Sequence, residues 1–219
     1  MARLLFEKLD DAIWMSHLDL MRVFQRAFQR AGLPLTHTQG FNPRPSVSIA
    51  LPMSVGVESI CELLDFDLEC DAPSNAEIME RLNAALVPGV RVLDVYPQGM
   101  KIRDVATLQV RVTLEYDKGV PANCVEEIGQ LFMRDNLLVE KKTKTGQQMQ
   151  DIIPMICSVN ASEVDAHTVI LDAVVCCQNP SLNPNQLVAA ISQEIPNFKP
   201  DFFKCRRLEI FDKNNSVFR

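Results

Sequence analysis

The first half of the chain changes between strand-like and helix-like spacing of its apolar residues. Residues 4–14 alternate with the period of a strand, whereas the apolar residues over 20–31 recur three or four positions apart, as on one face of a helix. Ser16 stands three positions before an acidic residue, as at a helix start, and Gly32 and Pro34 follow where a helix would end. These signals predict a strand followed by a helix.

Further elements follow before residue 100. The stretch 35–38 is expected to be extended, and a loop rich in proline follows it over 40–45. We predict, in order, an extended run over 46–53, a strand over 59–70, a helix over 75–86 and a strand over 90–97. The order strand, helix, strand, strand, helix, strand is that of a ferredoxin-like unit, with an antiparallel sheet covered on one face by two helices.

The second half predicts the same order of elements. After a joint over 97–106, we expect strands over 107–117, 137–144, 167–177 and 204–212, with helices over 123–134 and 183–195 and a less regular stretch over 150–165. The fold class predicted is therefore α+β, with tandem duplicated ferredoxin-like (βαββαβ) units over residues 1–100 and 105–219. The halves share little direct sequence similarity, so this repeat rests on element order alone.

Composition narrows the class of protein. The chain has 219 residues, 47% of them hydrophobic, yet no apolar run reaches the ~18 residues that cross a bilayer. Acidic residues near the N-terminus interrupt any signal-peptide core, so we expect a cytoplasmic protein with no membrane contact. The seven cysteines are an odd number without a C-x-x-C motif, which favours reduced, buried thiols and predicts no metal site.

Charge is distributed unevenly. The formal net charge is -6, yet no carboxylate occurs between Asp19 and Glu58. This cationic stretch favours an anionic partner, such as a phosphate backbone, a phosphorylated small molecule or an acidic protein face. The predicted anion contacts are Arg22, Arg26, Arg30 and Arg44. The alternative is a solvated helix face whose arginines are compensated from the strand by Asp65, Asp67 and Glu69.

The stretch over 16–59 also resembles a known family. The residues that carry the likeness are Ser16, His17, Leu18, Asp19, Arg22, Arg30, Ala31, Pro34, Gln39, Gly40, Phe41, Asn42, Pro43, Pro45, Ser48, Pro52, Gly56, Glu58 and Ser59, with weaker matches over 141–156 and 204–210. In this text the chain resembles the uncharacterised radical-SAM-linked proteins, which are encoded beside, or fused to, a radical S-adenosylmethionine protein.

That resemblance implies an accessory or substrate-presenting partner of a radical SAM enzyme. The chain lacks cysteines spaced C-x-x-x-C-x-x-C, so we expect the iron-sulfur cluster and S-adenosylmethionine only on the partner, with no cofactor bound by this chain. The loop over 40–46 either joins two strands rigidly or forms part of a site, and the resemblance favours a site. The pocket residues predicted are His17, Gln39, Gly40, Phe41, Asn42 and Ser46.

Three functions stay open at this level. The leading hypothesis is a non-catalytic accessory protein that binds an anionic substrate such as RNA, with no DNA expected. The second is an RNA-processing or RNA-modifying enzyme, for example in tRNA modification, that uses His17 or His37 as a general acid or base, although His17 also suits a structural role at the helix start. The third is a protein-interaction module without nucleic acid.

Overall fold

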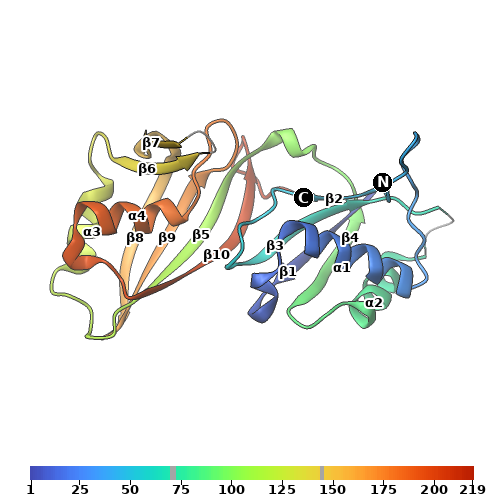
Figure 1. Cartoon of the computed structure of the whole chain (residues 1–219), viewed down its shortest axis with the longest axis horizontal. Coiled ribbons are helices and arrows are strands. Elements are labelled where there is room, and N and C mark those ends of the chain that lie inside the picture. Colours follow the sequence, from blue (N-terminus) through green and yellow to red (C-terminus); the bar gives the residue numbers. More distant parts are fainter. Residues whose placement is uncertain (70–72, 144–145) are drawn as a thin grey trace. The chain divides into compact units, whose positions relative to one another are not determined.

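The chain divides into two compact units. The computed structural model describes residues 1–69, 73–143 and 146–219, so that Cys70 and Lys144, at the ends of two predicted strands, lie outside the described residues (Figure 1). Unit 1 comprises Met1–Asp104 together with Arg219, and unit 2 comprises Val105–Phe218.

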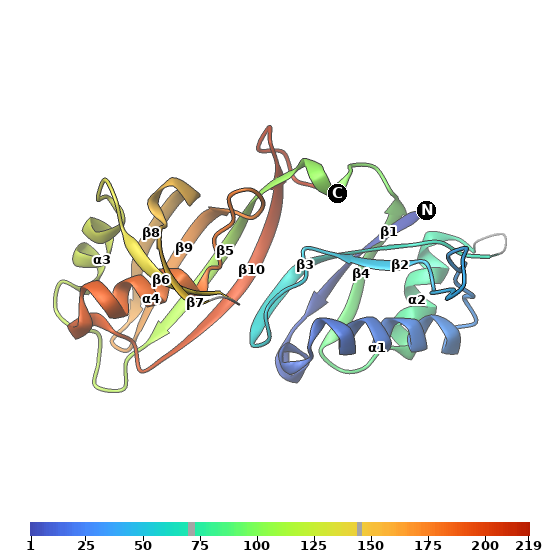
Figure 2. The same ribbon diagram turned by 45° about the horizontal axis from the view of Figure 1, so that its top comes forward.

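Unit 1 is a four-stranded antiparallel sheet with two helices on one face (Figures 1 and 2). Its strands pair in the order β4-β1-β3-β2. The elements are β1 (Ala2–Lys8), the short 3-10 helix η1 (Asp10–Trp14), α1 (His17–Arg30), β2 (Val47–Ala50), β3 (Val57–Phe66), α2 (Asn75–Ala85), β4 (Val90–Pro97) and the 3-10 helix η2 (Ile102–Asp104).

Helix α1 forms where its apolar spacing and its cap predict it. The Ser16 hydroxyl accepts a hydrogen bond from the Asp19 backbone N–H at 3.3 Å and so satisfies one free donor of the first turn. Gly32, at φ 66°, turns the chain away after the helix. Phe24 and Phe28 are fully buried and meet the rings of Phe6 and Phe66 at 4.7 and 5.0 Å between centroids. This aromatic layer fixes α1 on the sheet.

Unit 2 also has a four-stranded antiparallel sheet, in the order β10-β5-β9-β8. Its elements are β5 (Val105–Glu115), α3 (Cys124–Phe132), β6 (Leu138–Thr143), β7 (Gly146–Asp151), the 3-10 helix η3 (Ile153–Met155), β8 (Ile156–Asp165), β9 (Thr168–Cys176), α4 (Asn185–Glu194), the 3-10 helix η4 (Pro196–Phe198) and β10 (Phe202–Asp212). Strands β6 and β7 form a separate two-stranded hairpin.

The structure corrects the expected second half in one respect. The predicted strand over 137–144 joins β7 in the hairpin, and the position beside β9 is taken by β8, from the stretch expected to be less regular. Strand β8 is an edge strand, and most of its residues are exposed. Because none of its positions is fully buried, it lacks the apolar alternation by which a strand is recognised in a sequence.

Smaller corrections concern unit 1. The strand predicted over 4–14 ends at Lys8, because Asp10 takes a left-handed conformation (φ 49°) and opens η1. The run predicted over 46–53 is paired only over Val47–Ala50. It ends there because the next residue, Leu51, also takes a left-handed conformation (φ 47°). Residues 35–38 are extended but make only isolated bridges.

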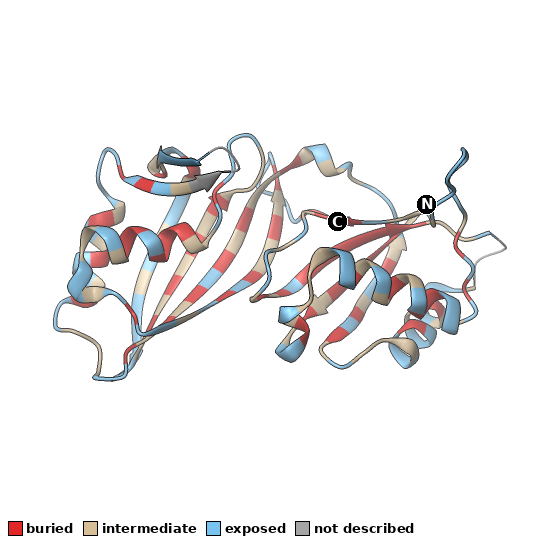
Figure 3. Ribbon diagram, viewed as in Figure 1, coloured by how far each residue is buried: buried red, intermediate tan, exposed pale blue. Residues whose placement is uncertain are grey.

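Burial follows the layers of each unit. In Figure 3, buried positions alternate along the strands of unit 2, and each long helix turns one buried side to its sheet. The fold is therefore mixed α/β, with four α-helices among the described residues and antiparallel sheets. No helix in the described part of the chain is long and apolar enough to cross a membrane.

Candidate anion-binding site

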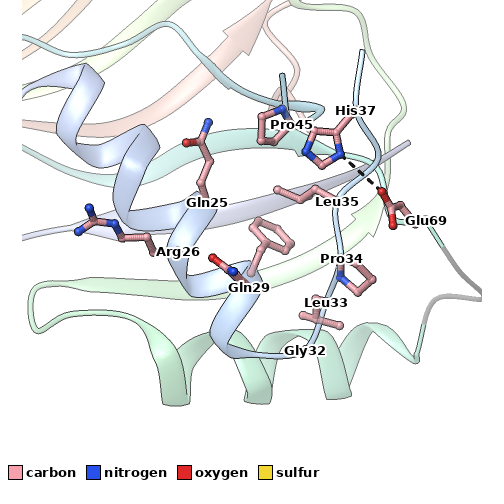
Figure 4. A pocket seen from close by; sticks show the side chains of 11 residues that line it. Gln25, Arg26, Gln29, Gly32, Leu33, Pro34, Leu35, His37, Pro45 and Glu69 are labelled. Carbon is pink, nitrogen blue, oxygen red and sulfur yellow. Dashed lines mark ion pairs between the residues drawn. The ribbon is translucent and has the colours of Figure 1, made fainter. Parts of the chain in front are cut away.

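A cavity of about 560 Å³ lies beside the C-terminal half of α1 (Figure 4). Helix α1 supplies one wall, and the chain that follows it, with the ends of two further segments, supplies the other. The residues that line it are Gln25, Arg26, Phe28, Gln29, Gly32, Leu33, Pro34, Leu35, His37, Pro45 and Glu69.

Backbone hydrogen bonds bring the second wall together. The extended stretch 34–38 lies between two other segments, because Ser46 N–H donates to the Thr36 carbonyl at 2.7 Å and Thr36 N–H donates to the Asp67 carbonyl at 2.9 Å. One step further, Glu69 N–H donates to the Pro34 carbonyl at 2.9 Å. This pairing brings Glu69 to the cavity although it is distant from the helix in sequence.

His37 and Glu69 lie next to each other on that wall. The His37 Nδ1 lies 3.5 Å from the Glu69 Oε1, and both side chains are about half exposed, at 50% and 53% (Figure 4). Their exposure leaves both groups accessible to a ligand, since neither is enclosed by the protein.

The four predicted arginines have different environments. Arg22 donates to the Asp19 carboxylate at 3.1 Å, and Arg30 donates to the Ala85 carbonyl at the end of α2. The Ser16 hydroxyl, and after it Arg22, hold the pKa of Asp19 below its ordinary value. Within the described ranges, the exposed side chains of Arg26 and Arg44 make no hydrogen bond or ion pair. Of these four, Arg26 and Arg44 therefore present guanidinium groups without a partner among the described residues.

The strand carboxylates do not compensate these arginines. Asp65 pairs with Arg3 at 2.6 Å, Asp67 lies 3.4 Å from the N-terminal amine, and Glu69 pairs with His37. The alternative of a helix face neutralised from the strand therefore fails for Arg26. The stretch that lacks carboxylates in sequence nevertheless has Glu69 beside it in space.

The loop over 38–44 is closed at its base and exposed at its tip. Thr38 N–H donates to the Arg44 carbonyl at 2.8 Å, and Arg44 N–H donates to the Thr38 hydroxyl at 3.0 Å. Gly40 has φ 139°, which favours glycine, and Phe41 is fully exposed at a relative accessibility of 113%. The loop thus carries an aromatic ring into solvent.

None of the predicted pocket residues lines the cavity. Gln39, Gly40, Phe41 and Asn42 belong to the exposed loop, whereas Ser46 is half-buried beside it. The residues missed are Gln25, Gln29 and Glu69. Gln25 and Gln29 flank Arg26 at helical spacing, so the sequence contained a signal for them. Glu69 was considered from the sequence only as a possible partner of the helix arginines, and its place beside His37 depends on backbone pairing with the stretch 34–38.

The structure does not bring His17 and His37 together. His17 is the first residue of α1, whereas His37 lines the cavity with Gln25 and residues after it. Eight helical positions, or about 12 Å along the axis, separate His17 from Gln25. The His17 Nδ1 is buried without a hydrogen-bond partner among the described atoms. The two imidazoles are therefore not placed as an acid–base pair in one cavity.

The thiols are only partly buried. Cys61, Cys124 and Cys205 are buried, whereas Cys157 is exposed, contrary to the expectation of buried cysteines. All six described cysteines are free. The described residues include no group of three or more histidine, cysteine or carboxylate side chains placed to hold a metal ion.

Comparison with known proteins identifies a family. Residues 2–184 match the family described as "Uncharacterized protein conserved in bacteria (DUF2344)". The chain belongs to this family. No curated protein matches it.

Two solved structures show likenesses of different strength. One is a chain of the "Crystal Structure of a Cbf5-Nop10-Gar1 Complex", with 8% identity, a TM-score of 0.55, and coverage of 95% of this chain and 48% of that one. At this identity the likeness shows the fold alone. An unknown protein from Galdieria sulphuraria has 12% identity and covers 94% of this chain and 96% of that one, but its TM-score of 0.27 carries no argument.

Proposed function

We propose that this DUF2344 protein is a non-catalytic accessory of a radical SAM enzyme and that its unit 1 binds RNA. The single observation that carries RNA binding is the pair of free, exposed guanidinium groups: Arg26, which lines the cavity, and Arg44, which precedes the lining residue Pro45 in the chain. The radical SAM partnership rests on the resemblance of the stretch 16–59. The iron-sulfur cluster and S-adenosylmethionine belong to that partner, in the cytoplasm.

Phosphate suits this surface for physical reasons. Guanidinium groups bind phosphate oxygens through two parallel hydrogen bonds, and Arg26 and Arg44 have no internal carboxylate that competes for them. The chain as a whole carries a net charge of -6, so a polyanion is attracted only where cationic groups are gathered. Position, more than total charge, therefore selects the binding face.

The exposed loop favours single-stranded RNA over duplex DNA. Phe41 is fully exposed a few residues before Arg44, and an unpaired base stacks on such a ring. In a duplex the base faces are already stacked, so the ring would gain nothing. The combination of free arginines with one free aromatic ring is typical of single-strand binding.

The two other functions receive less support. An enzyme using His17 or His37 requires the histidine to converge with the arginines in one cleft. His37 lines the cavity with Arg26, whereas His17, the first residue of α1, does not. A protein-interaction module that binds an acidic partner would use the same arginines but has no need of the exposed Phe41 ring.

We also propose that the units are tandem ferredoxin-like duplicates. The orders β4-β1-β3-β2 and β10-β5-β9-β8 are equivalent once the hairpin β6-β7 is treated as an insertion. The same contact recurs in both: Arg3 lies opposite Asp65 on β1 and β3, and Arg111 lies opposite Asp172 on β5 and β9. A common ancestral unit accounts for both agreements.

The test measures RNA binding by two double variants of equal charge. Arg26→Ala with Arg44→Ala removes the free guanidinium groups, whereas Arg22→Ala with Arg81→Ala removes two that are paired with Asp19 and Glu77. Fluorescence anisotropy with a short single-stranded RNA should show at least about a tenfold loss for the first, since each charge-assisted contact contributes about 1.5 to 3 kcal/mol. The second should bind almost as the parent does.

Three results would overturn the proposal of RNA binding. Equal losses in both double variants would mean that only net charge matters, and unchanged binding in the first would exclude the free arginines. If the radical SAM protein co-purifies through Arg26 and Arg44 while no RNA binds, the protein-interaction function replaces RNA binding.

A further inference from the structure

The cavity beside α1 has an apolar floor. The rings of Pro34 and Pro45 supply the accessible part of this floor (Figure 4). Phe28, Leu33 and Leu35 lie beneath, with side chains that are 0%, 2% and 7% exposed. The volume of about 560 Å³ lies within the range of small-molecule sites. Such a floor favours a planar ring over a bare inorganic anion, because apolar surface gains little from contact with a hydrated ion.

The rim of the cavity is polar and changes sign from one end to the other. Gln25 and Gln29 stand one helical turn apart on α1, and each amide offers donors and an acceptor. In Figure 4 the Arg26 guanidinium lies away from the His37–Glu69 pair, with the two glutamines between them. One end of the rim is therefore cationic, the middle neutral and the other end carries a carboxylate.

We infer that the cavity binds a single nucleotide. Its base lies on the apolar floor, the glutamine amides meet the base edge, and the phosphate reaches Arg26. Glu69 sets this orientation, because its carboxylate repels a phosphate but accepts a hydrogen bond from an amino group on a base. The His37 ring on the same wall offers a face for stacking.

This inference rests on the proposed RNA binding and specifies which kind of nucleotide of the RNA occupies the cavity. Adenine, cytosine and guanine carry an exocyclic amino group, which can donate a hydrogen bond to Glu69. Uracil has no amino group and presents carbonyl oxygens instead. We therefore expect the cavity to prefer a nucleotide with an amino group over a uridine nucleotide. A free nucleotide and a nucleotide within RNA share this chemistry.

The first experiment titrates the protein with AMP, GMP, CMP, UMP and ribose 5-phosphate. Binding is followed by the NMR signals of side-chain amides and by calorimetry. The amino-bearing nucleotides should bind about threefold to tenfold more tightly than UMP, the value of one hydrogen bond, and ribose 5-phosphate should bind more weakly still. A ranking without base preference would overturn the inference.

Variants locate the bound nucleotide. Gln29→Ala should weaken AMP binding by about threefold to tenfold, whereas Gln130→Ala, the control on α3 in unit 2, should leave it unchanged. Glu69→Gln should reduce the preference over UMP, because an amide also donates to a carbonyl oxygen. If neither Gln29→Ala changes the affinity for AMP nor Glu69→Gln changes the preference over UMP, the nucleotide binds elsewhere and the inference is overturned.

The failure of this inference can be told from failure of the proposed function. If RNA binds through Arg26 and Arg44 but no mononucleotide is detected in the cavity, the inference is wrong and RNA binding stands. If AMP binds with the expected preference and RNA does not bind, RNA binding is wrong, and the cavity is a site for free nucleotides.

Discussion

The two units contain the same ion pair in different surroundings. Arg3 and Asp65 are joined by two hydrogen bonds, at 2.6 and 3.1 Å, with side chains 0% and 4% exposed. Arg111 and Asp172 are joined in the same way, at 2.7 and 2.9 Å, but are 45% and 36% exposed. Water weakens the attraction at the second pair, so equal geometry does not mean equal energy.

The cavities beside the first helix of each unit have similar volumes but different charged side chains. Their volumes are about 560 Å³ beside α1 and about 510 Å³ beside α3. Arg26, without an internal partner, lines the first, whereas Glu126, which accepts a hydrogen bond from Gln130 at 3.3 Å, lines the second. A similar fold thus presents a guanidinium together with a carboxylate in one cavity and a carboxylate without a guanidinium in the other, and binding has to be argued from the side chains.

The largest expected effect follows from breaking the buried pair. Asp65→Ala leaves the Arg3 guanidinium buried without its carboxylate and should lower the free energy of unfolding of unit 1 by about 3 to 5 kcal/mol. Hydrogen exchange of the β1 and β3 amides in urea measures it. Replacing both residues, with Arg3→Met and Asp65→Leu, should cost much less. A loss below about 1 kcal/mol in Asp65→Ala would put this pair on a par with an exposed one.

The next effect concerns the two cavities. Arg26→Glu replaces the cation of the cavity beside α1 with a carboxylate, the group that Glu126 supplies in the other, and should weaken RNA binding about tenfold to a hundredfold. Arg26→Ala should make the dependence of log affinity on log salt shallower by about 0.7, the value of one phosphate contact in a single strand. Glu126→Gln is the control and should change neither quantity. Anisotropy titrations at several salt concentrations decide this.

An intermediate effect is expected at Tyr116 in unit 2. Its hydroxyl donates to the Phe198 carbonyl at 2.9 Å, so Tyr116→Phe should lower the free energy of unfolding of unit 2 by about 0.5 to 1.5 kcal/mol. Hydrogen exchange at β5 in urea measures this change. An unchanged stability would show that water replaces the hydrogen bond at no cost.

A smaller effect is expected at the exposed ion pair. Asp172→Ala should lower the free energy of unfolding of unit 2 by less than about 1 kcal/mol, and added salt should reduce the difference further. Hydrogen exchange at β9, at low and high salt, provides the measurement. A loss as large as that of Asp65→Ala would remove the contrast between the units.

The smallest effect at neutral pH is expected at Tyr96 in unit 1. Its hydroxyl is buried without a hydrogen-bond partner among the described atoms, so Tyr96→Phe should not destabilise the unit. Burial is the main cause that raises the pKa of Tyr96 from 10.0 to about 12. Between these values the folded state holds the proton more tightly than the unfolded state, so stability should fall as pH rises from 10 to 12.

The measurement compares the parent protein with Tyr96→Phe. Urea unfolding of unit 1 at pH 9 and pH 11.5 should show a smaller loss of stability in the variant. If both proteins lose the same stability, Tyr96 titrates alike in its folded and unfolded states.

Local features of the fold were predictable from the sequence. Helix α1 could be predicted, because its cap at Ser16 and its buried stripe around Phe24 and Phe28 involve residues that are neighbours along the chain. Strand β8 could not, because it is an edge strand with no fully buried position. The predicted order of elements was nevertheless correct for the main sheet, because β8 occupies the place in that order that was expected for 137–144.

The site was predictable only in part. Arg26 and His37 were both named from the sequence, and both line the cavity. The proline-rich loop was expected to shape the pocket, yet Gln39 to Asn42 form an exposed tip, because hydrogen bonds between Thr38 and Arg44 close the loop before it can fold over α1. Such closure depends on backbone geometry that composition does not specify.

The sequence by itself determined the positions of charge along α1: three arginines at intervals of four, with only Asp19 near enough on the helix to pair with one of them. The tertiary structure decided which arginine is free. Helix packing places Arg30 against the Ala85 carbonyl, and strand pairing brings Glu69 to His37, so that Arg26 is left to the solvent beside the cavity. Contacts within a helical turn follow from spacing, whereas contacts between distant segments exist only once the sheet register is fixed.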